Sequence, residues 1–85
     1  MSIREYVKEK NEMLLKCSVE ELKKFVRKYK KFYSKEYLEN FEKADDKLLE
    51  VTLHKLIANS FDLPENFIMK SVEWLEKNGF SPYIW

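Results

Sequence analysis

The sequence predicts an all-α protein: a compact bundle of four helices with short connections, or five helices if the third one breaks. Three observations lead to this fold class. Apolar residues recur at helical intervals along most of the chain. Glycine occurs once and proline twice, whereas a sandwich or barrel of short strands needs many more turn residues. A chain of 85 residues is long enough for one helical domain, which we expect to span positions 1–85.

The first helix is expected to begin at Ser2. Ser2 as the N-cap and Glu5 three residues later form a capping-box pattern, in which each side chain accepts a hydrogen bond from the other residue's amide. Apolar side chains then share one arc at 100° per residue, and we expect this arc to face the core. Its members are Ile3, Tyr6, Val7, Met13, Leu14 and Cys17.

A second capping box at Ser18 and Glu21 predicts the start of the next helix. Acidic residues lie at its beginning and lysines near its end, an order that suits the helix dipole and predicts that the helix ends near Tyr33. Its apolar face consists of Val19, Leu22, Phe25, Val26, Tyr29, Phe32 and Tyr33.

Ser34 is the next expected N-cap, and no glycine or proline occurs from there to Ser60. The pattern favours one long helix, bent near Asp45, whose carboxylate falls inside the apolar face. The alternative is a break in which Asp45 or Asp46 caps a new helix. Beyond Leu48 the helix is apolar nearly all round, which is typical of a central, buried helix. It leaves a narrow polar strip of Lys47, Glu50 and His54.

The last helix is expected to carry Pro64 in its first turn, where the missing amide hydrogen costs nothing. Gly79 is placed to end the helix in the left-handed conformation, with Phe80 contacting Leu75 as in a Schellman motif. The residues expected to be buried are Leu63, Phe67, Ile68, Ser71, Val72, Trp74 and Leu75.

The residues that carry catalytic chemistry are scarce. Cys17 and His54 are the single cysteine and histidine, so the usual thiolate and imidazole metal sites are excluded. One glycine cannot build a phosphate-binding loop. We interpret Cys17 as a packed small hydrophobe and His54 as a surface partner of Glu50. The sequence therefore predicts a non-enzyme with no catalytic residue, metal, cofactor or small-molecule substrate.

The single cysteine and the absence of a long apolar stretch predict a cytoplasmic protein that does not insert into a membrane. Lysine outnumbers arginine fourteen to two. This bias often accompanies the AT-rich genomes of low-GC bacteria and their phages.

Seven cations and no acid lie between positions 23 and 35. Three interpretations are open: a solvated helix face, which is favoured, a nucleic-acid contact, or a face for an acidic protein. The net charge of +1 argues against nucleic acid, as do aromatic rings expected on the opposite side of this helix. The basic residues are Lys23, Lys24, Arg27, Lys28, Lys30, Lys31 and Lys35.

Aromatic residues gather at the end of the chain, and two interpretations remain open. The tail seals the core, or it docks a second copy or another protein. The leading hypothesis is therefore a small interaction protein, a homodimer or the partner of another protein. The alternative is a small nucleic-acid-binding regulator that uses the basic face. The residues of the expected partner interface are Trp74, Phe80, Tyr83, Ile84 and Trp85.

Overall fold

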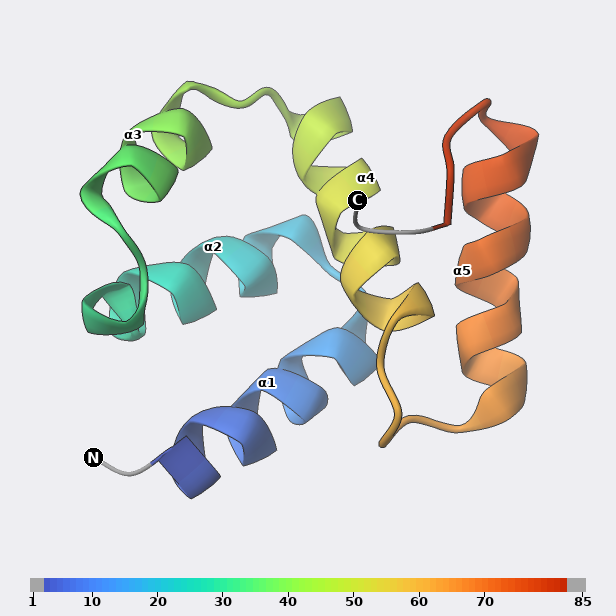
Figure 1. Cartoon of the computed structure of the whole chain (residues 1–85), viewed down its shortest axis with the longest axis horizontal. Coiled ribbons are helices and arrows are strands. Elements are labelled where there is room, and N and C mark those ends of the chain that lie inside the picture. Colours follow the sequence, from blue (N-terminus) through green and yellow to red (C-terminus); the bar gives the residue numbers. More distant parts are fainter. Residues whose placement is uncertain (1–2, 83–85) are drawn as a thin grey trace.

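Five α-helices make up the structure, a computed structural model that describes residues 3–82 (Figure 1). The described residues contain no strand, which confirms the all-α class. The helices are α1 (Ile3–Lys16), α2 (Val19–Lys28), α3 (Lys35–Lys43), α4 (Asp46–Ala58) and α5 (Glu65–Lys77), with a 3-10 turn η1 (Lys30–Phe32) between α2 and α3.

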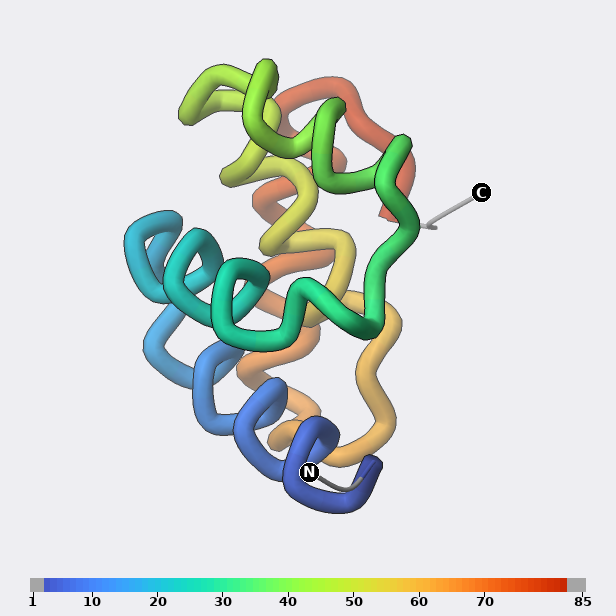
Figure 2. Tube along the Cα trace, turned by 90° about the vertical axis from the view of Figure 1, so that its left-hand side faces the viewer, coloured from blue at the N-terminus to red at the C-terminus, as the bar shows by residue number. Residues whose placement is uncertain are grey.

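The expected long helix is broken between α3 and α4, so the favoured prediction of one continuous helix is wrong. Ala44 adopts an extended conformation, and the carboxylate of Asp45 accepts a hydrogen bond from the amide of Leu48 at 2.8 Å. A continuous helix would have turned this carboxylate into the apolar face, whereas the break lets it cap α4. The chain changes direction here, and α3 and α4 diverge (Figures 1 and 2).

Helix α4 is the central element, as its nearly continuous apolar surface predicts. It packs against α5, α2 and α1. Leu53 and Ile57 are almost completely inaccessible to solvent, and Leu49 and Val51 are also buried. The exception is Leu48, which is exposed beside the break before α4.

Side-chain caps start two of the helices where the sequence predicts them. The hydroxyl of Ser18 accepts a hydrogen bond from the amide of Glu21 at 3.5 Å, and that of Ser34 accepts one from the amide of Tyr37 at 3.1 Å. These bonds satisfy amides that have no partner within the helix. The predicted cap at Ser2 lies outside the described residues.

The end of α5 is a Schellman motif, as predicted. Gly79 has a φ of 81°, and the amide of Phe80 donates to the carbonyl of Leu75 at 2.8 Å. At the other end, Pro64 is the N-cap of α5 and so directly precedes the first turn in which it was expected. The chain after α5 returns to α4, where the side-chain amide of Asn59 donates to the carbonyl of Pro82 at 2.8 Å.

The core joins α1, α2 and α4, but four residues assigned to it from the sequence are exposed. Ile3 and Val7 lie on the first turns of α1, which extend past α4 (Figure 1). Cys17 lies at the α1–α2 corner with a positive φ of 48°, and Phe32 lies beyond the end of α2. None of the described helices combines the length and apolar composition needed to cross a membrane.

Candidate functional site

A groove of about 600 Å³ lies between α5 and the corner that joins α1 to α2; we call it the Trp74 groove. Apolar and aromatic side chains make up most of its wall, and Leu15 at its edge is 51% exposed. Such grooves are the usual binding sites of small domains. The remaining lining residues are Cys17, His54, Pro64, Asn66, Phe67, Lys70, Ser71 and Trp74.

Residues from α4 hold the ring of Trp74 in the groove wall. The imidazole of His54 stacks on the indole with 4.2 Å between ring centroids and 19° between planes. The Nζ atom of Lys47 lies 4.8 Å from the indole centroid, within reach of a cation–π interaction. Lys47 also donates to the side-chain oxygen of Asn78 at 3.3 Å. Trp74 therefore presents a half-buried ring in a fixed orientation.

Beneath this ring, His54 and Ser71 join α4 to α5. The distance from Nδ1 of His54 to the hydroxyl oxygen of Ser71 is 2.9 Å, and Ser71 is only 2% exposed. Burial lowers the pKa of His54, and the charge of Glu50 opposes this shift. His54 is thus a half-buried contact between helices, and its interpretation as a surface partner of Glu50 is wrong.

Cys17 shares the groove with His54, although the two are distant in sequence. Its side chain is exposed, so its interpretation as a packed hydrophobe is wrong. Partial burial raises the pKa of the thiol, and the charge of Glu50 raises it further. A thiol with a raised pKa is a poor nucleophile at neutral pH because little thiolate forms.

Ser71 lines the groove but is only 2% exposed, and its hydroxyl is engaged by the imidazole of His54. Among residues 3–82 no group of three or more histidine, cysteine or acidic residues is arranged to hold a metal ion.

The residues of the predicted partner interface are only partly brought together. Trp74 lines the groove and Phe80 does not; the chain after α5 runs on the side of α4 away from the α1–α2 corner (Figures 1 and 2). Phe80 is partly exposed, and the bond from Asn59 to Pro82 shows that the chain folds back at least this far. Tyr83, Ile84 and Trp85 lie outside the described residues.

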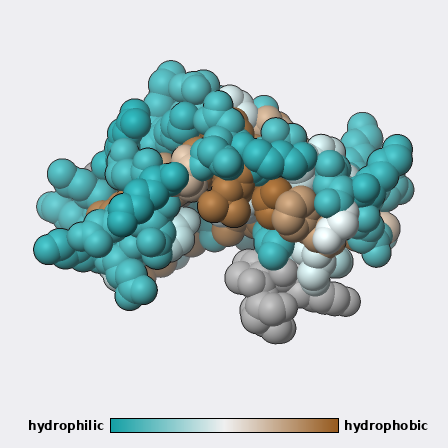
Figure 3. Space-filling model, turned by 90° about the horizontal axis from the view of Figure 1, so that it is seen from above, coloured by the Kyte–Doolittle hydropathy of each residue, from teal (hydrophilic) through white to brown (hydrophobic). Residues whose placement is uncertain are grey.

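A second apolar recess, of about 160 Å³, lies between α3 and α4. Seen from above, apolar residues show in the middle of a largely hydrophilic surface (Figure 3). The recess is lined by Tyr37, Phe41 and Leu48, and contains no charged side chain among its lining residues. It is about a quarter of the size of the Trp74 groove.

The predicted basic face does not form one continuous stripe. Helix α2 ends at Lys28, and acids from other helices neutralise two of its lysines. The Nζ of Lys23 lies 3.2 Å from a carboxylate oxygen of Asp46, and that of Lys28 lies 2.9 Å from Glu9. Lys24 lines a cleft shared with three glutamates. Among the described residues, the predicted basic residues left outside such contacts are Arg27 near the end of α2 and, farther along, Lys30, Lys31 and Lys35.

Known proteins offer no further guide. No protein family, curated protein or solved structure matches this chain.

Sequence reasoning missed Ser71 as a polar contact, although one signal was available. Ser71 lies on the apolar face of the last helix, and a buried hydroxyl needs a hydrogen-bond partner. Thr52 and His54 are two hydrogen-bonding residues on the central helix. Thr52 instead donates to the carbonyl of Leu48 in its own helix at 3.0 Å, which leaves His54.

Proposed function

We propose that this protein is a non-enzymatic interaction protein that holds an apolar segment of a protein partner in the Trp74 groove. The observation that carries the proposal is the indole of Trp74, which α4 fixes in the wall of a large, mostly apolar groove. Fixed aromatic rings in apolar grooves are the commonest anchors of protein interfaces. Lys70 adds a positive charge to the lining, so the partner segment is expected to carry an acidic residue near its apolar anchor.

Two further observations support recognition rather than catalysis. The thiol of Cys17 has a raised pKa, and the hydroxyl of Ser71 is buried. Nucleic-acid binding along the whole predicted face is less well supported, because acids neutralise Lys23 and Lys28. The partner is either a second copy, as in the predicted homodimer, or another protein.

A pair of lysine substitutions tests whether the groove binds a partner. Leu15 on the groove edge and Met69 on α5 are 51% and 48% exposed, and Met69 does not line the groove. A random peptide library is selected against the wild type, and the recovered peptides are then measured against Leu15→Lys and Met69→Lys. Binding is followed by tryptophan fluorescence in a Trp85→Phe background, so that Trp74 alone reports.

We expect the selection to recover apolar peptides that carry an acidic residue. These peptides should shift the emission of Trp74. Their affinity should be at least tenfold lower for Leu15→Lys than for the wild type and unchanged for Met69→Lys. Recovery of no peptide that distinguishes the two variants would overturn the proposal. Sedimentation equilibrium of the same proteins identifies the partner class. A dimer that only Leu15→Lys dissociates would make the partner a second copy, and a monomeric wild type would make it another protein.

A further inference from the structure

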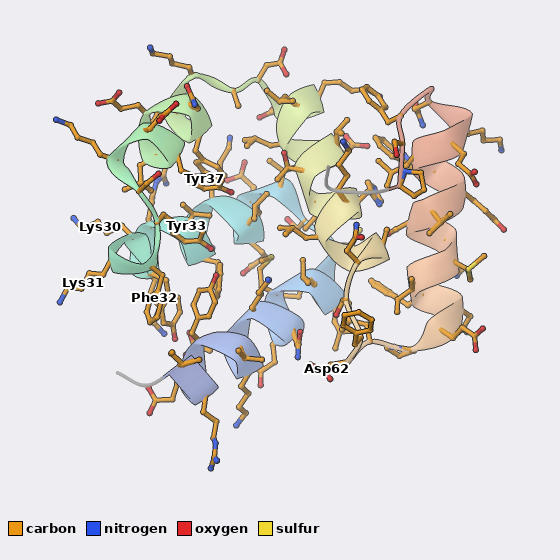
Figure 4. All side chains as sticks on the ribbon, in the orientation of Figure 1. Lys30, Lys31, Phe32, Tyr33, Tyr37 and Asp62 are labelled. Atoms are coloured by element: carbon orange, nitrogen blue, oxygen red, sulfur yellow. The ribbon has the colours of Figure 1, made fainter. Side chains whose placement is uncertain are left out.

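The corner between α2 and α3 brings an exposed aromatic ring next to unpaired lysines. Helix α2 ends at Lys28, and the chain continues as the 3-10 turn η1. Residues in such a turn point about 120° apart, so consecutive side chains fan out. Lys30 and Lys31 extend away from the body of the protein, and Phe32 follows them directly (Figure 4). An uninterrupted α-helix would have kept Phe32 on the buried face, opposite the lysines.

Phe32 has one ring face covered and a large part of its surface free. The ring of Tyr6 stacks on it at 4.6 Å and 18°, and the ring of Tyr29 meets it edge-on at 5.8 Å. Phe32 nevertheless remains 41% exposed. A ring that is stacked on a neighbouring ring and is still this exposed has the form of a stacking platform.

The charges at this corner are available to a ligand. Residues 29–35 contain three lysines and no acid. Within the part of the chain that the structure describes, Lys30, Lys31 and Lys35 form no salt bridge, unlike Lys23 and Lys28. The nearest acid in the sequence is Glu36, in the first turn of α3.

We propose that this corner binds single-stranded nucleic acid, with phosphates at Lys30 and Lys31 and a base stacked on Phe32. An unpaired base exposes the aromatic face that such a platform needs, whereas bases in a duplex are already stacked. Lysines on a turn of three residues also lack the helix or the guanidinium fork that reads a duplex groove. This site is separate from the Trp74 groove, with which it shares no lining residue.

Fluorescence anisotropy with a short fluorescein-labelled oligo-dT strand tests the proposal. Binding is measured at about 20 mM and about 200 mM salt, because phosphate contacts make affinity depend on salt. The variants are Lys30→Glu/Lys31→Glu and Phe32→Ala. Their matched controls are Lys43→Glu/Lys77→Glu, with the same change in net charge, and Phe61→Ala, which removes a ring that is 99% exposed elsewhere.

We expect wild-type binding at low salt that weakens with added salt. Lys30→Glu/Lys31→Glu should lower the affinity at least tenfold and reduce the slope of log K against log salt by about 1.4, the value for two phosphates on a single strand. Phe32→Ala should lower it about tenfold, as loss of one stacked base does. The two controls should stay within about twofold of the wild type.

A conservative variant covers the case in which Phe32→Ala fails to fold without its stack on Tyr6. Phe32→Trp keeps a ring at the site, and oligo-dT should quench its added fluorescence. No wild-type binding at low salt, equal losses in the matched controls, or an unquenched Phe32→Trp would each overturn the proposal. Competition by polyglutamate, together with no effect of Phe32→Ala, would assign the corner to an acidic protein instead.

Discussion

The imidazole of His54 and the hydroxyl of Ser71 join α4 to α5 through a contact of 2.9 Å. Burial lowers the pKa of His54 from its ordinary 6.5, with Glu50 opposing the shift. The folded protein therefore binds this proton less tightly than the unfolded chain. The contribution of the neutral His54 imidazole to the free energy of unfolding is complete above pH 6.5 and is lost as the pH falls through the folded pKa.

We expect the wild-type free energy of unfolding to fall as the pH is lowered from about 7.5 to about 5. The decline should be shallower in His54→Gln, which keeps a hydrogen-bonding side chain but does not titrate. Urea unfolding at each pH measures the difference, and NMR titration of the imidazole gives its pKa directly. A pKa at or above 6.5 in the folded protein would contradict this account.

For Tyr29 we expect the opposite pH dependence, a loss of stability as the pH rises. Its hydroxyl donates to a carboxylate oxygen of Glu9, which raises the pKa of Tyr29 from 10.0 to about 12. Because the folded pKa is raised, the contribution to stability is complete below pH 10 and is lost as the pH rises beyond it. The free energy of unfolding should fall less steeply through this range in Tyr29→Phe than in the wild type.

Glu9→Gln provides the control for Tyr29, because it keeps a hydrogen-bond acceptor and removes the charge. It should flatten the alkaline slope as Tyr29→Phe does, since the carboxylate is what opposes ionisation of the phenol. Urea unfolding between about pH 9 and about pH 12 measures both slopes, because the contribution of Tyr29 is lost across this range. Identical slopes in all three proteins would show that the Glu9–Tyr29 bond does not couple to folding.

Removal of the Asp45 cap should destabilise the protein without changing its fold. Asp45→Ala leaves the amide of Leu48 without its partner, at an expected cost of about 1 kcal/mol. The exposed Glu42→Ala, one turn earlier on the chain, should change the free energy of unfolding by less than about 0.5 kcal/mol. Chemical denaturation measures both, and equal effects would mean that the cap contributes nothing specific.

Gly79 should resist substitution because of its backbone alone. A Cβ added there would meet no atom within 4 Å, but its φ of 81° disfavours a side chain. Gly79→Ala should cost about 1 kcal/mol, and Gly79→Asn should cost less because asparagine tolerates this conformation better. Thermal unfolding compares the two variants. An alanine variant as stable as the wild type would show that the positive φ of Gly79 does not disfavour a side chain in this Schellman motif.

Most of the helix boundaries were predictable because local chemistry sets them. Ser18, Ser34 and Gly79 each act through bonds that span only a few residues, so the sequence pattern is sufficient to locate them. The central position of α4 was also predictable, because a helix that is apolar nearly all round has to be covered on most sides.

The break at Asp45 and the exposure of Phe32 were not predictable in the same way. At Asp45 the sequence allowed both a continuous helix and a cap, and in the broken chain the adjacent Asp46 pairs with Lys23 of α2 at 3.2 Å. At Phe32 the helical spacing of apolar residues continues in the sequence, but α2 ends at Lys28 and the ring of Phe32 lies against that of Tyr6. Both outcomes depend on contacts between residues that are distant in the chain.

In the candidate site, too, some features follow from the local sequence and others from contacts between distant residues. The sequence by itself determined the helical class, most helix ends, and Trp74 as a residue of interest. Only the tertiary structure decided that Trp74 lies against His54 and Lys47, that Ser71 contacts His54, and that a groove separates α5 from the α1–α2 corner. Periodicity fixes which side of a helix is apolar, whereas the angle and register between two helices depend on how their side chains interlock.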